Sequence, residues 1–337
     1  MDNLSRTSFL KRTIRSQAFT LVVLLVILIL IFSILALIND ANFFSANTFI
    51  GILQDLAVPA FLAIGAACLI VSGAIDLSQA SVGAMSGIIV AISISWWGLP
   101  WYVGVIIALG VSGIIGLIIA ILVNELGLVP FIATMAMTAI VKAIMLLLAT
   151  DSNGVMQSNI NFKDSTLTNI GNYSIANFIP ATVFLVIVAF IVYGLILKKT
   201  KMGRSIYMIG GNRMASRLSG INAKKISYFL FINCSLLGGL SGIIYTARSK
   251  QGSLQALSGD QFTGLTAAIL GGISFSGGSG GMGGAFIGLL LLKTFYKGMM
   301  IGGSSTYLTS VLSGALLILA LTLDVWSQKR HNKRLGV

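Results

Sequence analysis

Long apolar runs constrain this chain more than any other feature of its sequence. The first, from residue 18 to residue 38, is 21 residues long and carries no charged side chain. A helix needs about 20 apolar residues to cross a bilayer core of roughly 30 Å, whereas membrane β-strands alternate over about ten residues. With 56% hydrophobic and 9% charged residues in 337, the chain cannot be an ordinary soluble domain. The sequence predicts an all-α, polytopic membrane protein.

About ten such runs predict about ten transmembrane helices within a membrane domain from residue 18 to residue 326. The second, third, eighth and ninth are candidates for broken or re-entrant helices. The first exceeds the 7 to 15 residues of a signal-peptide core, so we interpret it as an uncleaved span. The expected spans are 18–38, 48–71, 81–97, 101–123, 130–149, 177–197, 226–247, 262–276, 285–301 and 306–326.

Positive charge is concentrated in three segments, although the net charge of +13 could at first suggest nucleic acid. Residues 1–17, 198–225 and 327–337 hold 16 of the 22 Lys and Arg residues. Basic segments beside membrane spans remain in the cytoplasm, so both termini and the 198–225 loop are expected there. The polar stretch 150–176 is then an external loop. This distribution favours membrane topology over binding to RNA or lipid, and no nucleic-acid partner is expected.

The basic segment 198–225 contains a short amphipathic pattern. Asn212 is a suitable N-cap and Gly220 a suitable C-terminal stop for one helix, on which Met214, Leu218 and Ile221 share a face. An amphipathic helix in a cytoplasmic loop can dock in a groove of a soluble partner. The alternative is a loop that only anchors the topology.

A polar segment interrupts the apolar sequence between residues 56 and 95. Its candidate functional residues are Ser72, Gly73, Asp76, Ser78 and Gln79. A carboxylate at the centre of a spanning helix costs roughly 2.5–3.5 kcal/mol, so it usually faces a cavity or caps broken backbone. Asp76 and Gln79 fit a capping box at a helix start. The second interpretation is that the broken helix lines a translocation path.

A glycine-rich segment runs from Gly271 to Gly284 and has eight glycines in 14 positions. It lacks the Gly-Lys-Ser/Thr ending of a phosphate-binding loop, so this chain is not expected to hydrolyse ATP. A tight reversal or close helix contact is expected at Gly271, Gly272, Gly277 and Gly278.

Other chemistry has little support in the sequence. Cys68 and Cys234 fall in apolar segments and are expected to pack there, with no metal site and no catalytic cluster, so no enzyme is predicted. Lys293 and Lys297 fall in or near a predicted span, and lysines near helix ends can snorkel. The only histidine is His331, which disfavours a proton-coupled carrier. A sodium-coupled secondary carrier and a non-transporting scaffold remain alternatives.

From about residue 43 to residue 326 the sequence resembles the permease subunit of bacterial ABC importers of the ribose type. The residues that carry the resemblance are Phe43-Phe44-Ser45, Ile52-Leu53-Gln54, Ser72-Gly73, Asp76-Leu77-Ser78, Pro130-Phe131-Ile132-Ala133-Thr134, Gly203-Arg204, Gly210-Gly211-Asn212, Ala215, Arg217-Leu218-Ser219-Gly220-Ile221 and Leu270-Gly271-Gly272. The chain departs from the family pattern at Gln79-Ala80, Gln261, Thr263, Ser279 and Gly281, which leaves the substrate open.

The resemblance implies a multi-pass protein of the bacterial inner membrane that binds no cofactor itself. Its partners would be a second permease subunit, identical or related, cytoplasmic ATPase subunits that hold ATP and Mg²⁺, and an external solute-binding protein. The helix capped by Asn212 would be the coupling element, with ATPase contacts at Arg213, Met214, Arg217, Leu218 and Ile221. The solute would be a monosaccharide or a similar small polar molecule, with a nucleoside or a furanose-like signalling molecule as alternatives.

Overall fold

The computed structural model describes residues 17–38, 42–175, 179–305, 308, 311–312, 314–319, 321–322 and 325–326. Two pairs of short antiparallel strands occur: β1 (Asn159–Asn161) with β4 (Gln251–Ser253), and β2 (Ser174–Ile175) with β3 (Ile179–Pro180). The remaining regular structure is helical, which confirms the predicted all-α class. The helices are α2 (Gln17–Ile38), α3 (Ala46–Leu56), α4 (Pro59–Val71), α5 (Gln79–Ser95), α6 (Trp101–Asn124), α7 (Pro130–Leu148), α8 (Ser165–Asn172), α9 (Ala181–Lys199), α10 (Lys201–Gly211), α11 (Arg213–Leu218), α12 (Ala223–Ser249), α13 (Thr263–Leu270) and α14 (Met282–Ile301).

Six of the described helices are long and apolar enough to cross a membrane, namely α2, α6, α7, α9, α12 and α14. The pair α3 and α4 makes a seventh candidate, bent by 50°. Pro59 is the first residue of α4, and its missing N–H cannot continue the hydrogen-bond ladder of α3. The second expected span is therefore a broken helix, as predicted.

The third, eighth and ninth expected spans differ in position or length from the prediction. The third corresponds to α5, which has 17 residues. The eighth was wrong in extent, because α13 has only eight residues and ends where the glycine-rich segment begins. The ninth corresponds to α14, a continuous helix that begins at Met282 rather than residue 285. In the tenth, 306–326, 13 of the 21 residues are described and all 13 are helical, as expected, whereas residues 1–16 and the tail from residue 327 lie outside the described residues.

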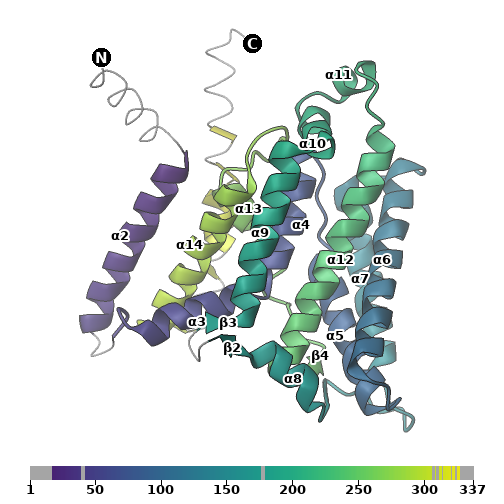
Figure 1. The fold of residues 1–337 in the computed structure, drawn as a ribbon, viewed down its shortest axis with the longest axis vertical. Coiled ribbons are helices and arrows are strands. Elements are labelled where there is room, and N and C mark those ends of the chain that lie inside the picture. Colours follow the sequence, from purple (N-terminus) through teal and green to yellow (C-terminus); the bar gives the residue numbers. More distant parts are fainter. Residues whose placement is uncertain are drawn as a thin grey trace.

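The helices form a bundle in which α12 packs against α4, α5 and α6, while α2 lies at one edge beside α14 (Figure 1). Small residues let α5 and α12 approach closely. A Cβ atom added at Gly242 would lie 1.7 Å from the Gly83 carbonyl oxygen, and one added at Gly238 would lie 2.7 Å from the Gln79 carbonyl oxygen. Membrane helices pack by such small-residue contacts because lipid supplies no hydrophobic force between them.

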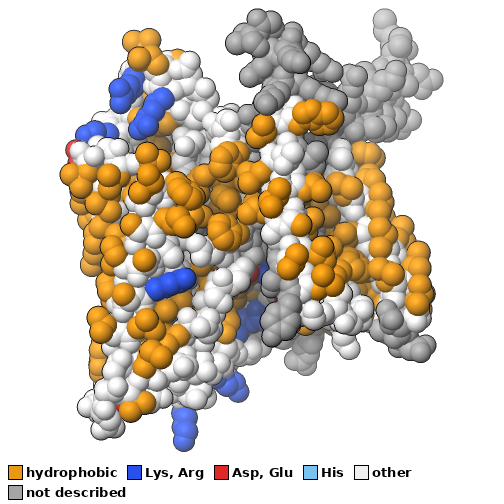
Figure 2. Space-filling model, turned by 180° about the vertical axis from the view of Figure 1, so that it is seen from behind, with side chains coloured by type: hydrophobic (Ala, Val, Ile, Leu, Met, Phe, Trp, Pro, Cys, Tyr) orange, Lys and Arg blue, Asp and Glu red, His pale blue; other side chains and the backbone are white. Residues whose placement is uncertain are grey.

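The two ends of the bundle carry different elements. Helices α10 and α11 lie at one end, from which α2 also begins, whereas α8 and the β1–β4 pair lie at the other (Figure 1). The described part of the polar stretch, residues 150–175, is folded onto that second end, where Ile160, Phe162 and Leu167 are buried. Between the ends, hydrophobic side chains are spread over the visible flank (Figure 2). This surface suits lipid rather than water.

Candidate functional site

The basic segment contains the helix predicted after Asn212, α11, and a further helix, α10, that was not predicted. Thr200 caps α10 by accepting a hydrogen bond from Gly203 N at 3.0 Å. Asn212 separates the helices, and its Oδ1 accepts from Ala215 N at 2.9 Å as the N-cap of α11. Gly220 follows α11 with φ +77°, a left-handed conformation that glycine adopts without steric cost. Both ends of α11 are thus determined locally.

The exposed face of α11 is apolar. Leu218 is 84% exposed and Met214 67% exposed, although both are large hydrophobic side chains. Ile221, expected to extend the same stripe, is only partly exposed, because it lies in the turn between α11 and α12. The free apolar surface is therefore smaller than predicted and centres on Leu218 and Met214.

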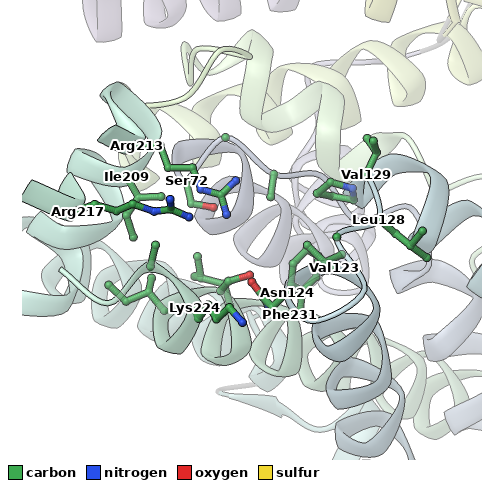
Figure 3. Close-up of a pocket in the computed structure, with 18 of the residues that line it drawn as sticks. Ser72, Val123, Asn124, Leu128, Val129, Ile209, Arg213, Arg217, Lys224 and Phe231 are labelled. Atoms are coloured by element: carbon green, nitrogen blue, oxygen red, sulfur yellow. The ribbon is translucent and has the colours of Figure 1, made fainter. Parts of the chain in front are cut away.

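A cavity of about 710 Å³ lies beside α11, and its lining includes Ser72, Gly73, Arg213, Met214 and Arg217. The side chains of Arg213 and Arg217 extend from α11 into the same space as Ser72, with Asn124 and Lys224 on the opposite wall (Figure 3). The structure thus brings the predicted coupling residues next to the first residues of the predicted helix break.

An ion pair joins the end of α6 to the start of α12 near this cavity. Lys224 Nζ lies 2.8 Å from Glu125 Oε2, and Tyr228 Oη donates to Glu125 Oε1 at 3.2 Å. The hydrogen bond from Lys224, with a second from Tyr228, lowers the pKa of the Glu125 carboxyl below its ordinary value.

Asp76 is buried in the helix break, and its contacts differ from the predicted capping box. Its Oδ1 accepts from Ser78 N at 2.7 Å and from Ser78 Oγ at 2.6 Å, while α5 begins only at Gln79. Gln79 does not reach back. Its Oε1 lies against Gly65 of α4, where the missing side chain leaves room for it. The capping-box prediction was therefore wrong.

The second carboxylate oxygen of Asp76 is a buried polar atom without a nitrogen or oxygen donor among the described residues. The Cys234 thiol of α12 lies beside the carboxylate. Thr138 of α7 donates to the neighbouring Leu77 carbonyl at 3.2 Å. Side chains of α7 and of the turn itself therefore stabilise the helix break through hydrogen bonds. One oxygen of the Asp76 carboxylate receives no hydrogen bond from a nitrogen or oxygen donor among the described residues.

Backbone from three distant segments meets at four glycines, Gly73, Gly210, Gly277 and Gly278, which we name the glycine junction. Gly278 N donates to the Val71 carbonyl at 2.8 Å. A Cβ added at Gly210 would lie 1.9 Å from that carbonyl oxygen, and one added at Gly277 would lie 3.0 Å from Gly73 N. The junction ties α10 to the end of α4 and to the reversal between α13 and α14.

The other glycines of the predicted reversal lie at the α13 end of the same loop. Gly272 has φ +88°, and a Cβ added at Gly271 would lie 2.3 Å from Gly284. Tyr207 of α10 also donates to the Gly280 carbonyl at 2.7 Å. The glycine-rich segment thus forms a tight reversal whose side packs on α10.

Sequence reasoning missed a second cavity of about 530 Å³ at the opposite end of the bundle. It is lined by Asp55, Arg248 and Asp260, together with Lys293 and Lys297, for which only snorkelling was considered. The lysines are instead partners in ion pairs with the two acids. Two features of the sequence could have indicated this cavity: the acid Asp55 inside the expected span 48–71, and the lysines Lys293 and Lys297, which lie four residues apart on one helix.

Comparison with known proteins identifies the type of membrane protein. Residues 48–321 match the model of the family described as "Branched-chain amino acid transport system / permease component". The chain belongs to this permease family. It is accordingly a transport subunit and not an enzyme, as predicted. No solved structure matches the chain.

Curated relatives of the permease extend over nearly the whole chain. The ribose import permease protein RbsC of Escherichia coli K12 is 31% identical over 321 residues, which cover 95% of this chain and 96% of the relative. The D-allose transport system permease protein AlsC of the same strain is 32% identical over 298 residues, covering 88% and 89%. The fructose import permease protein FrcC of Rhizobium meliloti is 30% identical over 311 residues, covering 90% and 85%. The expected resemblance to ribose-type permeases is confirmed.

Proposed function

We propose that this permease forms the membrane path of an ABC importer for a monosaccharide or a similar small polar solute. The names of its relatives refer to ribose, allose and fructose, whereas the family description refers to branched-chain amino acids. The sugar relatives match nearly end to end, and so they favour a sugar. Selection of the solute is assigned to an external binding protein.

The observation that carries the coupling part of the proposal is the apolar surface of α11 at the basic end of the bundle. Leu218, at 84% exposure, gains about 1.5–3 kcal/mol when it is buried in a partner. A helix that presents such anchors fits a groove on a soluble protein. We assign that groove to an ATPase subunit, which would hold the ATP and Mg²⁺.

The glycine junction provides a route from α10 and α11 to the membrane helices. Because Gly210 packs backbone to backbone on Val71 and Gly278, α10 cannot move without moving the end of α4 or the α13–α14 reversal. Closely packed elements move as rigid bodies rather than deform continuously. ATP-driven movement of α11 would thereby reach two helix ends inside the membrane.

The helix break at Asp76 is the proposed border of the translocation path. Irregular backbone at membrane depth is tolerated where it lines a wet cavity, and a buried carboxylate oxygen without a donor can accept from water or a solute hydroxyl. The Oδ2 atom of Asp76, which has no nitrogen or oxygen donor among the described residues, supports this interpretation over a purely structural role. Ser72, Gly73, Ser78 and Gln79 would shape the same break.

Topology and assembly complete the proposal. We infer that α10, α11 and both termini lie in the cytoplasm of a bacterial cell and that 150–176 lies outside the inner membrane, because basic segments beside spans remain in the cytoplasm. A second permease, identical or related, would complete the path, with one ATPase beneath each.

Uptake into reconstituted vesicles tests this function. The chain is assembled with and without its ATPase and binding protein, and labelled ribose, allose and fructose are supplied under ATP or under an ion gradient. We expect uptake of at least one sugar only with ATP and both partners. Gradient-driven uptake by the chain alone would instead establish a secondary carrier, and no uptake under either energy source would overturn the proposal.

A further inference from the structure

The second cavity has the size and position of a solute-binding site. Its volume of about 530 Å³ is within the range of roughly 300–1,000 Å³ that is typical of small-molecule sites. It lies between the α3–α4 break, the end of α12 and the lower half of α14, at the end of the bundle opposite α11 (Figure 1). That end is the proposed external side, where a binding protein would deliver solute.

Ion pairs line this cavity. Lys293 Nζ lies 3.2 Å from Asp260 Oδ1, and these side chains are only 12% and 23% exposed. Lys297 Nζ lies 3.8 Å from Asp55 Oδ2. Charged groups on membrane helices are costly unless they pair or face water. Their concentration on this wall therefore indicates a wet, polar cleft.

The cations of the cleft each have an acceptor within the chain. Arg248 Nη1 donates to the Gln54 carbonyl at 2.5 Å, and both lysines face carboxylates. Among the described residues, each cation that lines the cleft therefore already has a partner, and no unpaired cation is available to attract an anion. A neutral ligand rich in hydroxyls suits the arrangement better, because each hydroxyl can donate to a carboxylate and accept from an amine.

Aromatic rings add a second element of recognition. Tyr245 and Tyr296 both line the cleft, and Lys293 Nζ lies 5.5 Å from the centroid of the Tyr296 ring. Flat aromatic faces bury the apolar C–H surface of a sugar ring, while polar groups fix its orientation. Carboxylates, amines and tyrosines around one cleft match the two kinds of surface on a monosaccharide.

We propose that the cleft between the α3–α4 break, α12 and α14 binds a neutral monosaccharide after its release from the external binding protein. Asp55 and Asp260 accept hydroxyl hydrogen bonds, the paired lysines donate, and Tyr296 packs on the ring. This inference rests on the proposed function, since it assigns a site to the solute of that importer.

Direct binding tests the site without transport. The complex of permease and ATPase in nanodiscs is acetylated with increasing D-ribose, D-allose or D-fructose, and mass spectrometry follows Lys293 and Lys297. We expect saturable protection of both lysines by a transported sugar, and none by betaine at the same osmolality. Lys163, an exposed lysine of the 150–176 stretch, provides the internal control.

Two variants connect protection to the cleft. Asp260→Asn removes the carboxylate while keeping its shape, and Tyr296→Leu removes the ring. Each is expected to weaken protection of the lysines about tenfold and to reduce ATP-driven uptake at saturating loaded binding protein. The control Tyr173→Leu changes an exposed tyrosine outside the cleft and is expected to behave like the parent.

The outcomes separate the site from the function. If the parent imports a sugar but no sugar protects its lysines, or if the cleft variants match Tyr173→Leu, the site is overturned and the importer stands. If the variants lose affinity for the binding protein while the parent shows no sugar protection, the cleft is a docking surface instead. If the parent imports no monosaccharide, the assignment of a sugar to this importer fails, and the assignment of the cleft fails with it.

Discussion

Substitution of Gly210 by alanine tests whether the glycine junction transmits motion from α10. A Cβ at this position would lie 1.9 Å from the Val71 carbonyl oxygen and 2.6 Å from Gly278 N. Since real Cβ atoms essentially never come within 3.0 Å of a neighbour, the backbone must open by at least 1.1 Å, the difference between 3.0 and 1.9 Å. Both clashing atoms belong to one hydrogen bond, so the methyl group and that bond cannot coexist.

The expected destabilisation has two contributions, the steric overlap of the new methyl group and the loss of the hydrogen bond. Overpacking of a close contact costs about 1–3 kcal/mol, and loss of a hydrogen bond about 0.5–1.5 kcal/mol. Gly210→Ala should therefore destabilise the junction by about 1.5–4.5 kcal/mol. Gly211→Ala is the matched control, because its added Cβ has only one neighbour, at 4.0 Å. Alanine should even favour the helix slightly there, by up to about 1 kcal/mol.

The assay compares both variants after reconstitution with the ATPase and binding protein. For Gly210→Ala we expect normal membrane insertion, a lowered melting temperature and a large loss of ATP-driven uptake relative to ATP hydrolysis. Gly211→Ala should retain uptake. Equal uptake by the two variants would refute the role of the junction in coupling.

The other predictions concern α11, the helix break and the α6–α12 ion pair. Leu218→Asp and Arg217→Glu should leave the permease inserted in the membrane but lower its affinity for the ATPase in pull-down assays and lower its ATP-driven uptake. Leu218→Met should retain both the affinity and the uptake. Normal ATP-driven uptake by both charged variants would show that α11 is not part of the interface. Asp76→Asn should preserve assembly, judged by size-exclusion chromatography, and reduce uptake; a loss of folding would indicate a structural role only. Because the folded pKa of Glu125 is lowered, its stabilising effect is present above the ordinary carboxyl pKa and disappears as pH falls through the lowered value. Melting temperatures of the parent and Glu125→Gln should therefore differ at pH 7 and converge in acid, and a constant difference would contradict the ion pair.

Local rules account for what the sequence could predict. The apolar runs determined most of the spans, and the caps of α11 follow from Asn212 and Gly220, because these features depend on neighbours within a few residues. The capping box at Asp76 failed for a non-local reason. Gly65, on another helix, leaves a space that Gln79 occupies, and no property of residues 76–79 indicates it.

The junction and the cleft depend on contacts between distant parts of the chain. The glycine pattern indicated close packing, but not that Gly210 of α10 is the partner of Val71 and Gly278. In the same way, Lys293 could be recognised as a lysine in a span, whereas its pairing with Asp260 requires the turn before α13 to fold back beside α14. Such pairings come from the arrangement of helices rather than from periodicity.

Photo-cross-linking from position 218 tests the central claim most directly. A photoreactive residue replaces Leu218 in the assembled complex, and a second replaces Lys163 at the opposite end of the bundle. The account predicts an ATP-sensitive cross-link from position 218 to the ATPase and none from position 163. An ATPase that binds the permease normally without cross-linking to position 218 would contradict the docking of α11 and the coupling route built on it.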